Sequence, residues 1–121
     1  MTRINVGVKP KELPNKFLIA EHREIVRIPN AIKSGRFVMT GQPIHFCLGT
    51  GHVKFFYDKL EYLRKRYVEI YTELRSRGVN VTDMSSAWDG IEQCFMNDYA
   101  ERPEDREIIR KRLLEKGYDL E

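Results

Sequence analysis

The sequence has no apolar run approaching the 18 residues that a membrane-spanning helix needs, and from its first residues we expect no signal peptide. It has only two cysteines, Cys47 and Cys94, and their spacing matches neither a zinc site nor a redox motif. We interpret them as buried free thiols of a reducing compartment, with a disulfide as the alternative. Internal repeats and low-complexity tracts are absent as well. We therefore expect a soluble protein of the cytoplasm, bacterial or in a virus-infected host.

The chain has 121 residues, enough for one hydrophobic core, and we expect a single domain over residues 1–121 that is a monomer. Its charge is uneven along the sequence. Residues 1–53 contain 8 Lys and Arg against 3 Asp and Glu, whereas residues 79–121 contain 6 against 11. A basic front suggests a polyanionic partner, of which nucleic acid is the commonest. The alternative is an ordinary, mildly basic protein without such a partner.

Helical periodicity predicts three main helices with long irregular connections, and no segment reads as a convincing strand. The first helix is expected from Asn15, its N-cap, to about residue 34, with Pro29 bending it or dividing it in two. The second is expected over 52–77 and the third over about 103–116. A glycine would end each helix (Gly35, Gly78 and Gly117). The fold class is therefore all-α.

The second predicted helix carries apolar side chains at helical spacing, from Val53 to Leu74, and we assign them to the core. Its other face carries charges of both signs, among them Lys65, Arg66 and Glu69, and we assign this face to solvent. The Gly-Thr-Gly sequence at 49–51 could hold a phosphate on its N–H groups, or it could simply allow close backbone packing.

Three cations of the first helix, Lys16, Arg23 and Arg27, share one stripe of its surface. Glu24 lies at the edge of this stripe, and two guanidiniums so close favour the ionised form of its carboxylate. Glu24 is therefore suited to be a fixed anion or a base rather than a general acid. The alternative is a solvated helix face with ordinary ion pairs.

The small residue at position 2 permits removal of Met1, which would make Thr2 the N-terminus. An α-amine titrates near 7.7–8.0, so part of it is a neutral nucleophile at pH 7 and could form a Schiff base. The alternative is a frayed terminus without a role.

Three stretches together, MTRIN, AEHRE and LGTGHVKFFYDKLEYLRKR, resemble the pyrimidine-dimer DNA glycosylase/AP lyase family of the bacteriophage ultraviolet-damage endonuclease V type. The resemblance runs from Met1 to about Lys116 and is densest at 1–5, 18–27 and 48–78. It implies a compact three-helix protein whose N-terminal segment lies beside the first helix. It departs from the family at Phe17, where the phage enzyme has a histidine, and at His22, where it has a tyrosine.

The resemblance also implies roles for individual residues. The amine of Thr2 would attack the sugar C1′ of the damaged nucleotide, and Glu24 would be the essential carboxylate. Arg3, Arg23 and Arg27 would contact DNA, and in a looser alignment Arg112 and Lys116 would do so too. This chemistry needs no cofactor and no metal.

The function we expect is a bifunctional DNA N-glycosylase/AP lyase that excises a damaged pyrimidine, the cyclobutane dimer, from double-stranded DNA. Alternatives are the same amine chemistry on abasic sites or another modified base, a non-catalytic DNA-binding module, or a small helical protein with an acidic protein partner. Residues 117–121 are short and acidic where the phage enzyme has an aromatic and basic tail. We therefore expect abasic-site cleavage to be stronger than dimer excision.

Overall fold

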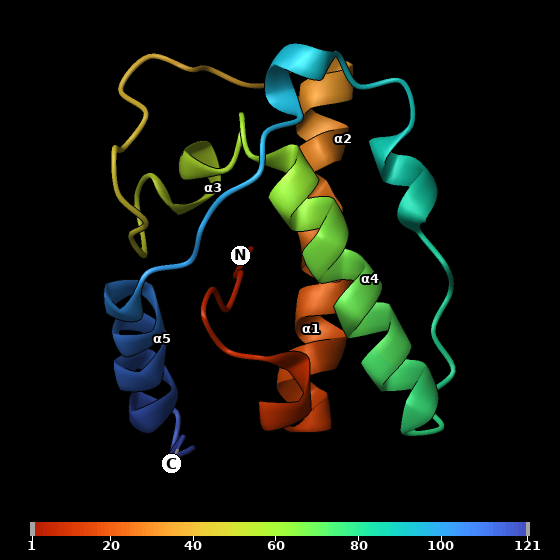
Figure 1. Cartoon of the computed structure of the whole chain (residues 1–121), viewed down its shortest axis with the longest axis vertical. Coiled ribbons are helices and arrows are strands. Elements are labelled where there is room, and N and C mark those ends of the chain that lie inside the picture. Colours follow the sequence, from red (N-terminus) through yellow and green to blue (C-terminus); the bar gives the residue numbers. More distant parts are fainter. Residues whose placement is uncertain (1, 121) are drawn as a thin grey trace.

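A computed structural model describes residues 2–120 and confirms the all-α fold class (Figure 1). The helices are α1 (Asn15–Ile25), α2 (Arg27–Ser34), α3 (His52–Phe55), α4 (Leu60–Ser76) and α5 (Pro103–Glu115), with the short 3₁₀ turns η1 (Pro10–Glu12), η2 (Ser85–Trp88) and η3 (Gln93–Phe95). Met1, and with it the predicted processing of the terminus, lies outside the described residues. Within 2–120, no helix is both long and apolar enough to cross a membrane.

The first predicted helix is divided into α1 and α2 at Val26, close to the expected proline. Pro29 has no N–H to offer the carbonyl of Ile25 four residues earlier, and in a continuous helix its ring would clash with that carbonyl. Gly35 ends α2 in the left-handed conformation at φ 75°, as predicted. The predicted N-cap is wrong by one position, because Pro14 is the cap and Asn15 is the first helical residue.

The second predicted helix is also divided, which the sequence pattern did not indicate. Residues 56–59 interrupt it between α3 and α4, and side chains from distant loops pair with the backbone there. Gln42 Nε2 donates to the last carbonyls of α3. Asn97 Nδ2 donates to the Asp58 carbonyl at 2.8 Å, and the Asn97 carbonyl accepts the N–H of Tyr62 at 3.3 Å. These long-range hydrogen bonds pair backbone groups that a continuous helix would otherwise pair.

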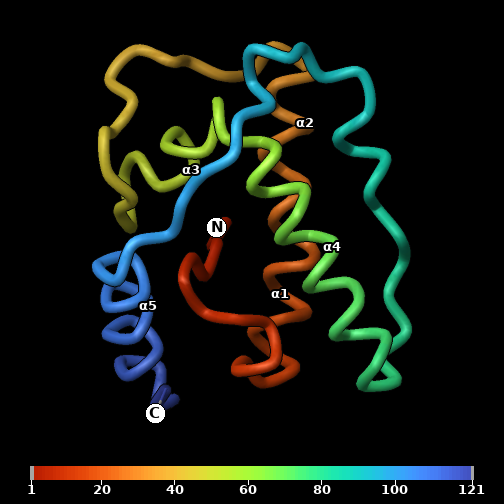
Figure 2. Tube along the Cα trace, viewed as in Figure 1, coloured from red at the N-terminus to blue at the C-terminus, as the bar shows by residue number. Residues whose placement is uncertain are grey.

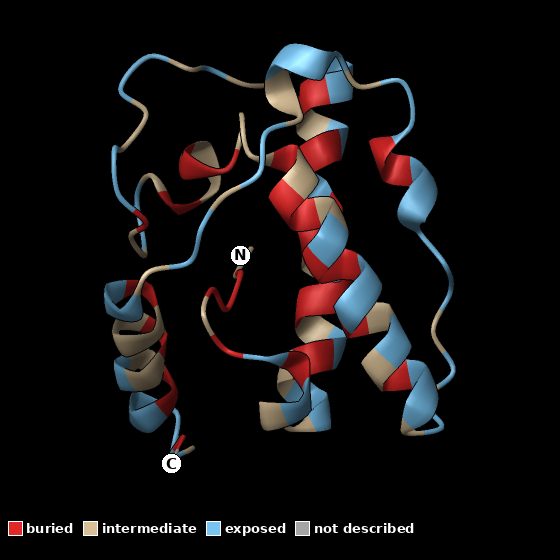
Figure 3. Ribbon diagram, in the orientation of Figure 1, coloured by how far each residue is buried: buried red, intermediate tan, exposed pale blue. Residues whose placement is uncertain are grey.

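The apolar stripes of α1 and α4 pack against each other and form the centre of the core, as expected (Figure 3). Fully buried side chains from both helices include Leu18, Ile25, Leu63 and Ile70. One assignment to the solvent face is wrong. Arg66 of α4 is only 3% exposed, because its guanidinium turns inward to form an ion pair.

The N-terminal segment 2–9 passes between α1 on one side and α5 on the other (Figures 1 and 2). Ile4, Val6 and Val8 are buried, so the segment is part of the core rather than a loose end. Gly7 permits the close approach to α5: at φ 84°, a Cβ there would lie 2.9 Å from Arg106 Cβ. The position expected from the resemblance, beside the first helix, is the one observed.

The last part of the chain follows the sequence closely. Residues 79–101 are irregular apart from η2 and η3, and α5 begins at Pro103 as expected. Asp105, in its first turn, accepts the N–H of Arg102 at 3.0 Å. Both cysteines are free thiols, as predicted, but neither is buried: Cys47 is half-buried and Cys94 is exposed.

Candidate active site at the N-terminal segment

A pocket of about 290 Å³ lies between the N-terminal segment, α1 and α5. Arg3 and Asn5 line it from the segment, Phe17, Ala20, Glu21 and Glu24 from α1, and Arg112 and Lys116 from α5. A second, smaller pocket of about 150 Å³ adjoins Thr2, Arg3, Gly49, His52 and Val53. Arg3 lines both pockets, so the first residues of the chain lie where the two depressions meet.

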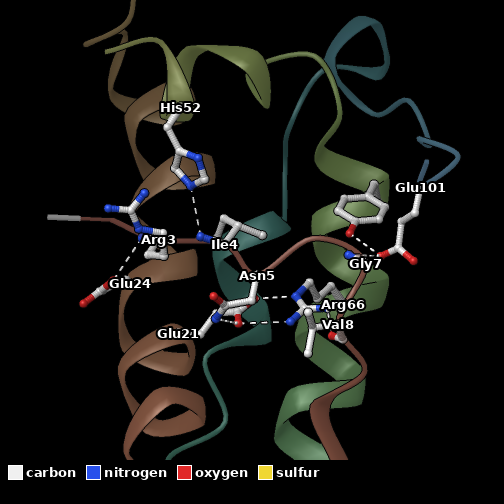
Figure 4. A network of polar contacts seen from close by, with 11 residues as sticks. Arg3, Ile4, Asn5, Gly7, Val8, Glu21, Glu24, His52, Arg66 and Glu101 are labelled. Carbon is white, nitrogen blue, oxygen red and sulfur yellow. Dashed lines mark hydrogen bonds and ion pairs between the residues drawn. The ribbon is translucent and has the colours of Figure 1, made fainter. Parts of the chain in front are cut away.

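The carboxylate of Glu24 lies directly against the start of the chain (Figure 4). Its Oε1 accepts the backbone N–H of Arg3 at 3.0 Å, and its Oε2 is 3.5 Å from the guanidinium of Arg23. Arg27 Nη1 is 3.5 Å from the side-chain oxygen Oγ1 of Thr2. The Glu24 side chain is 13% exposed, so it is partly withdrawn from water while it still reaches the pocket.

Positive charge gathers around this carboxylate. Burial lowers the pKa of Arg3, Arg112 lowers it further, and Glu24 acts in the opposite direction. Burial also lowers the pKa of Arg112, again against the attraction of Glu24. Two partly desolvated guanidiniums that repel each other favour the approach of an anion. The pocket therefore suits a ligand that brings phosphate groups close to the carboxylate of Glu24.

A buried polar network fixes the N-terminal segment to the helices. Asn5 Nδ2 donates to Glu21 Oε1 at 2.7 Å, and Glu21 forms a buried ion pair with Arg66. Arg66 Nη1 also donates to the Val8 carbonyl at 3.0 Å. Glu21 and Arg66 are 1% and 3% exposed, so each depends on the other to be charged inside the protein. The network holds the segment antiparallel to α1, with Arg3 at Glu24 and Asn5 at Glu21.

His52, the first residue of α3, contacts the segment from the opposite side. The N–H of Ile4 donates to His52 Nε2 at 3.0 Å, so the ring proton must be on Nδ1, which donates to the Cys47 carbonyl at 2.8 Å. Burial lowers the pKa of His52 to about 4, and the nearby Arg3 and Arg112 act in the same direction. The ring is therefore neutral at physiological pH, as its acceptor role requires.

The structure gathers the seven predicted site residues on one side of the molecule. Glu24, Arg3, Arg112 and Lys116 line the main pocket, Thr2 adjoins the smaller one, and the exposed Arg23 and Arg27 contact Glu24 and Thr2. Their catalytic and DNA-binding roles stay predictions. The Gly-Thr-Gly sequence has a packing explanation, because a Cβ on Gly51, at φ 93°, would lie 2.8 Å from Pro43 Cγ.

Sequence reasoning missed the residues that hold the segment in place, namely Asn5, Glu21, His52 and Arg66. For Arg66 a signal was present, since it directly precedes Tyr67 at the margin of the apolar stripe of α4. His52 stands at the start of a helix next to a glycine-rich turn, which gave no reason to pair it with Ile4. Contacts between positions 48 residues apart cannot be read from local patterns.

Comparison with known families is consistent with this geometry. A sequence profile of the family described as pyrimidine dimer DNA glycosylase matches residues 1–86. The chain belongs to this family. The match includes Thr2, Arg3, Glu24 and His52, and it ends before α5, so Arg112 and Lys116 lie beyond it.

Membership of the glycosylase family makes the protein a DNA repair glycosylase at the level of the family, with damaged DNA as its partner. The pocket is completed by α5, which lies outside the matched region and supplies Arg112 and Lys116. The family match alone does not show that these two residues line the same pocket as Glu24; the structure does.

Proposed function

We propose that the protein is a bifunctional glycosylase/AP lyase that uses the α-amine of Thr2 to excise a cyclobutane pyrimidine dimer and cleave the strand. The observation that carries this proposal is the hydrogen bond between Glu24 and the N–H of Arg3. It places a carboxylate against the peptide bond next to Thr2, at the edge of a cationic pocket. A binding module would need the cations but has no use for a carboxylate there, which would repel phosphate.

In the glycosylase step, the neutral amine of Thr2 attacks the sugar C1′. The C1′–N bond to the amine forms as the bond to the base breaks, and the base leaves with the electron pair and takes up a proton. Positive charge develops on the sugar during this exchange. The ionised Glu24 carboxylate, held by Arg3 and Arg23, stabilises that charge.

In the lyase step, the sugar ring opens and the amine nitrogen becomes a protonated imine at C1′. The imine acidifies the C2′ proton, and a carboxylate assists its removal. The electron pair then expels the 3′ phosphate from C3′, which nicks the strand. Glu24 is partly buried and accepts the N–H of Arg3, the residue after Thr2, so it is the group we assign to this proton transfer.

We assign the binding of DNA to the basic residues around the pocket. Arg3, Arg112 and Lys116 surround the pocket, and Arg23 and Arg27 lie exposed along the adjoining face of α1 and α2. Guanidiniums bind phosphates through paired, charge-assisted hydrogen bonds, and such contacts position a duplex without reading its sequence. We assign these five residues to the phosphates that flank the lesion.

The test uses three duplexes of one sequence: one with a single cyclobutane dimer, one with an abasic site and one undamaged. The proposal predicts cleavage of a glycosyl bond of the dimer together with strand cleavage on the first, strand cleavage on the second and neither on the third. Cleavage of the abasic duplex alone would support the amine lyase without dimer excision, as the second candidate function. Binding to damaged DNA without any product would refute both and favour a non-catalytic module.

A further inference from the structure

Two successive backbone N–H groups at the start of the chain are held from opposite sides. Glu24 of α1 accepts the N–H of Arg3, and His52 of α3 accepts the N–H of Ile4, both at 3.0 Å (Figure 4). Successive N–H groups of an extended segment point in opposite directions, so the two acceptors hold the two consecutive peptide units on either side of Arg3 between α1 and α3. The first of these units joins Arg3 to Thr2.

His52 is itself held rigidly. It is 3% exposed, its Nδ1 donates to the Cys47 carbonyl at 2.8 Å, and the rings of Phe46 and Phe56 meet its ring edge to face. A ring fixed at both nitrogens and on its faces has one orientation available to it. Its Nε2 is therefore an acceptor at a defined place, rather than a group that adapts to wherever the segment lies.

We propose that His52 is a positioning residue, which holds the Ile4 amide so that the Thr2 amine stays beside Glu24 for attack on DNA. The inference rests on the proposed function, since it explains how the amine is placed. Without the hydrogen bond to His52, the segment would keep its hydrogen bonds to Glu21 and Glu24 of α1 but lose the one that holds it from the side of α3. A displacement of about 1 Å at a reacting centre can cost about 10²-fold in rate.

The charged groups that face His52 come from three elements. Arg3 of the N-terminal segment and Arg112 of α5 disfavour its protonation, whereas Glu21 of α1 favours it. Burial, aided by the two arginines, outweighs Glu21 and the hydrogen bond to the Cys47 carbonyl, which raise the pKa, so the pKa of the ring is held near 4. A neutral ring leaves Nε2 free of a proton, which is the state that accepts from Ile4.

Two substitutions separate the hydrogen bonds of the ring. His52→Gln can place an amide oxygen near the Nε2 position and keep an acceptor for Ile4, whereas His52→Asn can place an amide N–H near Nδ1 and keep only the donor to Cys47. Both leave a smaller or differently shaped side chain among the same aromatic rings. His45→Asn, at an exposed position of the preceding loop, controls for the change of residue type.

The measurements are the single-turnover rate of borohydride trapping on an abasic duplex and, separately, the dissociation constant for the same DNA. We expect His52→Asn to slow trapping by about 10- to 100-fold with DNA affinity changed less than about threefold, and His52→Gln to recover most of the rate. Equal losses in the two variants, in proportion to their loss of stability, would overturn the proposal. So would an unchanged trapping rate in His52→Asn.

Hydrogen exchange of the Ile4 amide gives a readout that does not depend on activity. Exchange should be faster in His52→Asn than in His52→Gln, while the amides of α4 change equally in both. If the wild-type protein forms no borohydride-trapped complex with DNA, the amine mechanism is refuted. The hydrogen-exchange result still decides whether His52 holds the N-terminal segment. Identical Ile4 exchange in the two variants would refute that hold.

Discussion

Acid should destabilise the protein through His52, and the size of the effect follows from its environment. The pKa of this ring is about 4 in the folded protein, against about 6.5 for an exposed histidine. Between these values the unfolded chain binds a proton that the folded protein excludes, so stability is fully present above about pH 7 and falls as the pH falls toward 4. The whole gap corresponds to about 3 kcal/mol, of which about 2 kcal/mol is lost by pH 5.

The assay is urea unfolding at pH 7.5 and pH 5.0, with the free energy of unfolding taken by linear extrapolation. His52→Gln removes this titration, so its stability should depend less on pH than that of the wild type, by about 2 kcal/mol over the same interval. Burial also lowers the pKa of His22, which acts in the same direction, but that contribution is common to both proteins. Equal pH dependence in the two proteins would refute the reasoning.

Three further predictions follow from the site and its supports. Glu24→Gln preserves an acceptor for the N–H of Arg3 but removes the charge, so the rate of base excision should fall by ~10²–10³-fold. The rate of cleavage at a preformed abasic site should fall less. Similar, mild losses in both assays would make Glu24 a structural residue. With five proposed phosphate contacts, a plot of the logarithm of DNA affinity against the logarithm of salt concentration should have a slope of roughly −4 to −5. Arg27→Gln should reduce the size of this slope by about 1. The control Arg75→Gln, at an exposed cation near the end of α4, should leave it unchanged. Arg66→Met should cost about 3–5 kcal/mol in urea unfolding because it leaves Glu21 charged and buried, and a loss below about 1 kcal/mol would contradict the network.

The helices could be predicted from the sequence where local signals decide them. Gly35, Gly78 and Gly117 each have positive φ at a helix end, and Pro29 marks the division of α1 from α2. The break before α4 could not be predicted, because the apolar stripe runs straight through it. That break depends on Gln42 and Asn97, whose partners are distant in the chain, and local periodicity carries no information on such pairs.

The candidate site divides in the same way. The helical periodicity of the sequence predicts the stripe of cations with Glu24 at its edge. The family resemblance predicts Thr2 and Arg3 as site residues. The contacts that hold the N-terminal segment could not be predicted, because Asn5, Glu21 and His52 are polar residues whose burial is decided by tertiary packing. A charged residue on a helix is most often exposed, so the helical pattern alone assigns Arg66 to solvent. Its ion pair with Glu21 and its hydrogen bond to the Val8 carbonyl make its burial possible.

The most direct test of the proposed amine mechanism is to locate the covalent bond between protein and DNA. The protein is trapped with borohydride on an abasic duplex, digested with protease and nuclease, and the modified peptide is sequenced by mass spectrometry. The proposed amine mechanism predicts the adduct on the α-amine of Thr2, in protein from which Met1 has been removed, and no trapping when that amine is acetylated. An adduct on a lysine side chain, such as Lys116 in the same pocket, with undiminished trapping of the acetylated protein, would contradict it.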